Sequence, residues 1–256
     1  MLKGVVLKTT FVVIAIIYCF TARAQSFEDL LKPENLSQSW IKAIVYEPDS
    51  IFPKTTEFLK QPSKYPVLVY MHGCTGLNDD SREWARTIKN FGFIIIQPDS
   101  FAIPGRRSNC DPKTQRGQII EGFNSFKLRN QELRYARDEL LKLTWLDKNK
   151  IYLMGHSEGG MTVSRTPVDG FRAIISSGYW CTERLEIKHG ASPFLFINWV
   201  DDPWFRSRAE NRNPQICQQL TEKRAGTEQV LLVGQGHATS LSSRARLAVE
   251  NFLKAN

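Results

Sequence analysis

Residues 151–160 read IYLMGHSEGG, an apolar run that ends in a glycine-rich turn around Ser157. The run predicts a β-strand, and the Gly-x-Ser-x-Gly pattern predicts a tight strand-to-helix turn with a serine at its tip. A residue on such a turn has a strained backbone, so its neighbours two positions away must be very small. Gly155 and Gly159 meet that demand. An ordinary loop has a similar composition, so the interpretation of Ser157 as a nucleophile depends on partners elsewhere in the chain.

Short apolar runs recur from Pro66 to the C-terminus. They cover residues 67–71, 93–96, 151–154, 173–175, 194–200 and 230–233. Runs without polar alternation are typical of strands buried on both faces, as in a parallel sheet covered by helices. Residues 133–143 and 241–252 carry leucine, alanine, valine and phenylalanine at helical spacing. The sequence therefore predicts an α/β fold: a mostly parallel twisted sheet with helices on both faces. Residues 40–46 are expected to add an edge strand.

The first 24 residues differ from the rest of the chain. Lys3 and Lys8 precede an apolar stretch, and Ala22-Arg23-Ala24 closes it in an A-x-A pattern. This order is typical of a cleavable secretory signal, with the mature chain starting near Gln25. The alternative is an uncleaved anchor, although the apolar stretch is shorter than the roughly 20 residues that a membrane span needs. We expect a signal peptide over 1–24, a secreted or periplasmic protein, and no stable membrane association after cleavage.

Length and charge limit the remaining possibilities. The chain has 256 residues, 42% of them hydrophobic, which suits one core and predicts a single domain over 25–256. Loss of the signal would remove Lys3, Lys8 and Arg23 and no acid, so the formal charge would fall from +8 to +5. Basic residues form no consecutive block and no pattern interleaved with aromatic residues, so we expect no nucleic-acid partner.

A base and an acid for Ser157 are expected at the same edge of the sheet. His237 lies between the last predicted strand and the last predicted helix, where a general base would be near Ser157. The acid that orients the histidine is expected at the end of the preceding strand, in the chain order Ser, Asp, His. Asp201 is the preferred candidate because it follows that strand most closely. Asp202 stays the alternative.

Negative charge that develops on a substrate oxygen needs backbone N–H donors. Glu158, at the start of a helix directly after the nucleophile, supplies one by position. The glycine-bearing turn 71–76 after the first core strand supplies the second, and we expect the backbone N–H of Cys74 there. His72 and His156 are interpreted as packing or turn residues, and His189 has no identifiable partner. No metal or organic cofactor is expected.

Four cysteines remain after the signal: Cys74, Cys110, Cys181 and Cys217. An even number in a chain bound for an oxidising compartment indicates disulfides. No C-x-x-C pattern occurs, and the gaps between the four do not suit a zinc site. Four cysteines allow three pairings, and spacing alone does not choose among them.

The motifs HGCTG, QPDSFAIPGR, IYLMGHSEGG, WVDDPW and GQGH together resemble the α/β-hydrolase superfamily, and within it the dienelactone hydrolase family. The resemblance covers most of the mature chain and implies a Ser-His-Asp acyl hydrolase without a cofactor. It also implies the strand order 4-3-5-6-7-8, which places Cys74 beside Cys110 and Cys181 beside Cys217. Two departures stand out: the founding enzymes have cysteine where this chain has Ser157, and their substrate-gripping arginines would fall near Ile103 and Leu241.

The expected function is hydrolysis of small carboxylic esters or lactones through an acyl-enzyme at Ser157. A peptidase or amidase on the same fold and a non-catalytic binding protein are the alternatives, and the oligomeric state stays open. Basic residues near the expected pocket would either select anionic substrates or be ordinary solvated loop charge. They are Arg106, Arg107, Lys113, Arg116, Arg206, Arg208 and Arg212.

Overall fold

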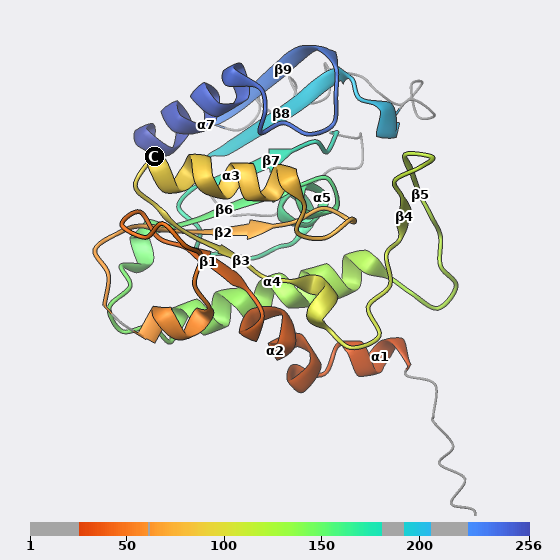
Figure 1. The fold of residues 1–256 in the computed structure, drawn as a ribbon, viewed down its shortest axis with the longest axis horizontal. Helices are drawn as coiled ribbons and strands as arrows, with labels where there is room; N and C mark the ends of the chain where they lie inside the picture. Colours follow the sequence, from red (N-terminus) through yellow and green to blue (C-terminus); the bar gives the residue numbers. More distant parts are fainter. Residues whose placement is uncertain (1–25, 61, 181–191, 206–224) are drawn as a thin grey trace, which may run out of the picture.

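The computed structural model describes residues 26–60, 62–180, 192–205 and 225–256. Their main feature is a seven-stranded sheet with the order β1-β3-β2-β6-β7-β8-β9 (Figure 1). The strands are β1 (Ile44–Tyr46), β2 (Val67–Met71), β3 (Ile94–Gln97), β6 (Ile151–His156), β7 (Ile174–Ser177), β8 (Phe194–Asp201) and β9 (Thr227–Gln235). All neighbouring strands run parallel except β1, which pairs antiparallel with β3. The predicted fold class and strand order are therefore confirmed.

Helices cover both faces of the sheet. The described helices are α1 (Phe27–Leu30), α2 (Pro33–Ile41), α3 (Asp79–Asn90), α4 (Ser125–Leu141), α5 (Glu158–Arg165) and α7 (Ser243–Ala255). One core layer packs side chains of α2, α4 and α5 against the sheet, including the buried Leu133 and Val163. The opposite layer packs α3 and α7, including Trp84 and Phe252. Burial on both faces explains why the central strands contain so few polar residues.

The N-terminal part of the fold differs from the expected edge strand over 40–46. Trp40 belongs to α2, and only Ile44–Tyr46 is a strand. The prediction was too long because Trp40 is an apolar residue on the buried side of an amphipathic helix, which looks like a strand residue in a short window. No helix in the described part of the chain is long and apolar enough to span a membrane.

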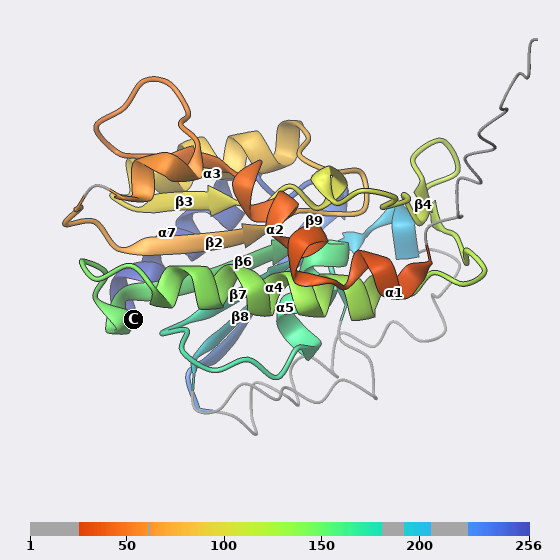
Figure 2. The same cartoon turned by 90° about the horizontal axis from the view of Figure 1, so that it is seen from below.

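A two-stranded hairpin, β4 (Cys110–Asp111) with β5 (Arg116–Gly117), projects away from the main sheet on the connection between β3 and α4 (Figures 1 and 2). The short 3-10 helix η2 (Ser100–Ala102) lies earlier on the same connection. We call residues 99–117 the β3–α4 segment. It is tied to the turn after β2 by a disulfide between Cys74 and Cys110.

Candidate active site

Ser157 lies at the tip of the turn between β6 and α5. Its backbone has φ 56° and ψ −113°, a strained conformation that L-residues rarely adopt. A Cβ atom on Gly155 would lie 2.3 Å from the carbonyl oxygen of Gly159, and one on Gly159 would lie 1.9 Å from that of Met71. Only glycine fits at either position, so the Gly-x-Ser-x-Gly pattern here reflects close backbone approach around a half-buried serine.

His237 and Asp202 form a hydrogen-bonded pair at the same edge of the sheet. The Nδ1 atom of His237 is 2.7 Å from Oδ2 of Asp202, whose side chain is 0% exposed. Because the carboxylate accepts the proton on Nδ1, the Nε2 atom of a neutral ring is left as a proton acceptor. The other carboxylate oxygen of Asp202 accepts the backbone N–H of Trp204 at 3.0 Å, which fixes the acid in place.

In the described residues Asp202, the alternative of the sequence analysis, makes the hydrogen bond to His237, and Asp201, the preferred acid, makes none. Asp201 is the last residue of β8 and is exposed, whereas Asp202 is buried one position further on. The register between β8 and β9 shifts between Trp199 and Asp201. Side chains alternate along a strand, so an irregularity of one residue decides which carboxylate faces the histidine.

The turn that carries His237 is anchored on several sides. Trp199 donates its ring N–H to the carbonyl of Ala238 at 2.8 Å, and Trp84 donates to the Thr239 hydroxyl at 3.1 Å. Asp80 accepts the backbone N–H of Ser240 at 2.9 Å. These bonds connect the turn to β8 and to α3, so His237 is held by the sheet and by a helix on one face.

His237 packs against His156, the residue directly before Ser157 in the sequence. The two imidazole rings lie 4.7 Å apart between centroids. In the described residues the Ser157 hydroxyl makes no hydrogen bond to His237, and catalytic hydrogen bonds of this kind often tighten only in the Michaelis complex. The structure thus brings the predicted serine and histidine together and adds Asp202 behind them.

His156 and His72 are buried, as expected for packing residues. Nδ1 of His156 lies 3.0 Å from the Ser177 hydroxyl and 3.6 Å from Oδ2 of Asp80. Burial lowers the pKa of His156 to about 4, with repulsion from His237 acting in the same direction. Burial also lowers the pKa of His72, whose Nε2 accepts the backbone N–H of Ser100. Both rings are therefore neutral near pH 7.

The two predicted oxyanion donors lie beside Ser157. Glu158 begins α5, and Cys74 follows β2, which pairs with β6 in a register that sets Met71 opposite Gly155. The turns after these two strands are consequently neighbours. Cys74, Ser157 and Glu158 all line one cavity of about 130 Å³.

The other walls of this cavity come from the β3–α4 segment, from α5 and from the residues that follow β7 and β8. They comprise Asn109, Cys110, Gly117, Met161, Tyr179, Trp204 and Phe205. Three of these seven residues are aromatic. Tyr179 lies edge-on to Phe205 at 6.4 Å, and Trp204 lies 5.3 Å from the His237 ring. In the sequence these residues come from four separate segments, so no local pattern connects them.

Arg106 is not available to select an anionic substrate. Its guanidinium is buried and bonds Oε2 of Glu158 at 2.7 Å. Arg107, Lys113 and Arg116 are exposed. Arg206, Arg208 and Arg212 lie outside the described residues.

The disulfide prediction is confirmed for one of its two pairs. Cys74 and Cys110 are bonded, with Cα atoms 5.9 Å apart. Cys181 and Cys217 lie outside the described residues, as does His189, and their pairing stays a prediction.

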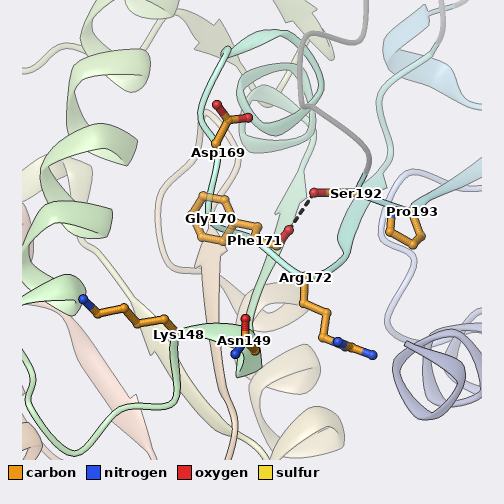
Figure 3. A pocket seen from close by; sticks show the side chains of 8 residues that line it. All are labelled: Lys148, Asn149, Asp169, Gly170, Phe171, Arg172, Ser192 and Pro193. Atoms are coloured by element: carbon orange, nitrogen blue, oxygen red, sulfur yellow. Dashed lines mark hydrogen bonds between the residues drawn. The ribbon is translucent and has the colours of Figure 1, made fainter.

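A larger hollow of about 420 Å³ lies at the opposite edge of the sheet (Figure 3). Its lining residues come from the segments that lead into β6, β7 and β8, whereas Ser157 follows β6. The charged side chains around it, Lys148, Asp169 and Arg172, are exposed. Open parallel sheets bind ligands at the carboxyl ends of their strands, so the smaller cavity beside Ser157 is the candidate active site.

Comparison with solved structures supports the fold. No family model and no curated protein matches the chain. A dienelactone hydrolase-like promiscuous phosphotriesterase from metagenomic libraries is similar, with a TM-score of 0.56 and 16% identity over 84% of this chain and 97% of that one. An α/β serine hydrolase without a lid from Xanthomonas campestris, XC6422, gives 0.52 and 15% over 83% and 86%. Est1E from Butyrivibrio proteoclasticus with bound ferulic acid gives 0.52 and 14% over 84% and 93%.

Proposed function

We propose that this chain, which has the α/β-hydrolase fold, is a serine hydrolase that cleaves small carboxylic esters or lactones through an acyl-enzyme intermediate. The observation that carries the proposal is the pair of His237 and buried Asp202, 2.7 Å apart, beside a strained serine turn. A histidine fixed through Nδ1 is prepared to act as a base through Nε2. A binding protein that only retains the fold has no physical need for this combination.

The reaction follows from the roles of these groups. Ser157 Oγ attacks the substrate carbonyl carbon as Nε2 of His237 takes the hydroxyl proton. The backbone N–H groups of Glu158 and Cys74 hold the oxygen that becomes negative, and Asp202 stabilises the imidazolium. The carbon–oxygen bond to the alcohol then breaks, and His237 gives its proton to that alcohol. Water repeats the sequence on the acyl-serine, releases the acid and restores Ser157.

The size of the cavity supports small substrates. A cavity of about 150 Å³ lined by apolar side chains is known to hold one benzene molecule. At about 130 Å³, the cavity beside Ser157 has room for a group of about one ring or a short chain. His237, which must reach the leaving oxygen, is not among its described lining residues, whereas both oxyanion donors are. We therefore assign the cavity to the acyl side of the substrate.

Est1E holds ferulic acid, an aromatic carboxylic acid, which agrees with a small carboxylic acid as the product of the proposed reaction. Amide hydrolysis remains the second candidate because the same triad also cleaves amides. The residues themselves favour neither bond, so ester and amide substrates of matched acyl group have to be compared directly.

A fluorophosphonate probe and an ester panel test the proposal. We expect the probe to label the wild-type protein and Ser192→Ala, whose serine lies at the opposite edge of the sheet, but not Ser157→Ala. Acetyl and butyryl esters should be cleaved with a higher kcat/KM than dodecanoyl esters. A wild-type protein that neither reacts with the probe nor cleaves any ester contradicts the function.

We also propose that the mature protein is secreted or periplasmic, from the signal pattern in residues 1–24. Export with cleavage should give a mature chain that starts near Gln25. Mass spectrometry of protein from the culture medium and the periplasm tests this. Full-length protein retained in the membrane would contradict it.

A further inference from the structure

A buried ion pair joins the residue after the nucleophile to the β3–α4 segment. Arg106 Nη2 donates to Oε2 of Glu158 at 2.7 Å, and the two side chains are 0% and 4% exposed. Replacing a buried ion pair with well-packed apolar residues is often neutral or stabilising, because desolvation offsets the attraction between the charges. A role in stability alone therefore gives little reason for this pair.

The Arg106 guanidinium is fixed independently of Glu158. Its Nε atom donates to the Ser100 hydroxyl at 3.2 Å, and Nη1 donates to the carbonyl oxygen of Arg107 at 2.6 Å. The rings of Phe101 and Phe123 lie 5.0 and 5.1 Å from its central carbon. A side chain held by this many contacts acts as a rigid support for the carboxylate that it binds.

Glu158 transmits this support to the site through its own backbone. It is the first residue of α5 and directly follows Ser157, whose φ of 56° is strained. Strained backbone persists only where its surroundings over-determine it. With the side chain of Glu158 anchored, the peptide between Ser157 and Glu158 has less freedom to rotate, and this peptide carries the N–H assigned to the oxyanion.

The β3–α4 segment also holds the second donor. Cys110 is bonded to Cys74, and Ser108 donates its hydroxyl to the carbonyl oxygen of Cys74 at 3.0 Å. One segment is therefore attached to both sides of the oxyanion site, covalently at Cys74 and by the ion pair at Glu158.

We propose that Arg106 is a positioning residue of the oxyanion site, which holds the backbone N–H of Glu158 in place through the Glu158 carboxylate. This inference rests on the proposed function of Ser157. Arg106 touches no substrate in this role. Its loss should lower the rate of steps that place negative charge on the substrate oxygen and leave ground-state binding nearly unchanged.

The decisive variant is the double substitution Arg106→Met with Glu158→Met. Arg106→Met alone leaves a buried, unpaired carboxylate and is expected to impair folding. The double variant removes both charges, keeps the peptide N–H of residue 158 and should fold, as circular dichroism and thermal unfolding will show. Arg107→Met is the matched control, because it removes an exposed arginine from the adjacent position.

The readouts are kcat and KM for a neutral ester and the second-order rate of fluorophosphonate labelling. Removal of an oxyanion donor costs roughly 100- to 1,000-fold in kcat, so a misplaced donor should cost about tenfold or more. We expect that loss in kcat and in labelling for the double variant, KM within about twofold, and partial recovery in Arg106→Lys with Glu158 intact. Arg107→Met should match the wild type.

A folded double variant with kcat and labelling rate within about twofold of the wild type overturns the positioning role while the proposed function stands. A loss of kcat/KM in the double variant that comes entirely from a higher KM also overturns the positioning role. A wild-type protein that the probe does not label overturns the proposed function first, and the positioning role with it.

Discussion

The amino-terminal and carboxyl-terminal edges of the sheet differ in the volume of their hollows and in how firmly their side chains are held. The amino-terminal edge has a hollow of about 420 Å³ among exposed charged residues such as Lys148 and Arg172. The carboxyl-terminal edge has a cavity of about 130 Å³ beside Ser157. There, Asp202 is buried and bonded to His237, and Glu158 is buried and bonded to Arg106.

If the proposed function is correct, the volume of a hollow does not identify the active site of this protein. Reactive groups are useful when their geometry is held before the substrate arrives. At the carboxyl-terminal edge His237, Asp202 and the two residues that carry the proposed oxyanion donors each have a second contact that fixes them. Lys148 and Arg172 reach into solvent, so their positions are not defined in this way.

Replacement of Asp202 should give the largest effect at the carboxyl-terminal edge. Asn at this position favours the wrong tautomer of His237, and the equivalent change in a known triad lowers kcat about 10,000-fold. We expect a loss of that order for Asp202→Asn in ester hydrolysis. Asp201→Asn, one residue away and exposed, should stay within about twofold. A larger loss in Asp201→Asn would show that the acid has been assigned to the wrong carboxylate.

Removal of the Cys74–Cys110 disulfide should come next. The bond joins residues 36 positions apart, for which the chain-entropy model predicts a loss of at most about 4 kcal/mol in the free energy of unfolding. Denaturant unfolding of Cys74→Ala with Cys110→Ala measures it. Dithiothreitol should lower the free energy of unfolding of the wild type by this amount more than it lowers that of the double variant, in which the bond is already absent. Equal stability of the oxidised wild type and the double variant would contradict the prediction.

The buried histidine at this edge predicts a pH dependence of stability. The pKa of His156 is about 4 in the folded state and about 6.5 when unfolded, so the unfolded chain takes up the proton first as pH falls. His156 should therefore cost nothing above about pH 6.5 and up to about 3 kcal/mol as pH falls to 4 and below.

Urea unfolding of the wild type and of His156→Gln between pH 7.5 and 4 measures the contribution of His156 to the pH dependence of stability. The pKa of His72 is also lowered, so the free energy of unfolding of the variant should still depend on pH, but less steeply than that of the wild type. Parallel pH profiles for the two proteins would show that His156 does not contribute.

The smallest effects are expected at the amino-terminal edge. Lys148→Ala and Arg172→Ala alter exposed side chains, so the free energy of unfolding should change by less than about 0.5 kcal/mol. Ester kcat/KM should stay within about twofold. A tenfold loss of activity in either variant would break the distinction between the edges and make the larger hollow a functional site.

The sequence predicted most of the fold because strands that are buried on both faces of the sheet consist of uninterrupted apolar runs. Five of the six predicted core strands begin within one residue of their observed starts, and 230–233 lies inside β9. The turn around Ser157 could be predicted equally well, because Gly155 and Gly159 are required by close contacts within and near the turn itself. Such local constraints do not depend on how distant segments pack.

The choice between Asp201 and Asp202 could not be made from the sequence, because it depends on a register shift between β8 and β9. The pairing of Arg106 with Glu158 joins residues 52 positions apart, and the aromatic walls of the cavity come from separate segments. The amino-acid sequence by itself determined the sheet, the serine turn and the approximate places of its partners. Only the tertiary structure decided which carboxylate bonds His237 and what supports the proposed oxyanion donors, because these contacts are set by packing between segments and not by local spacing.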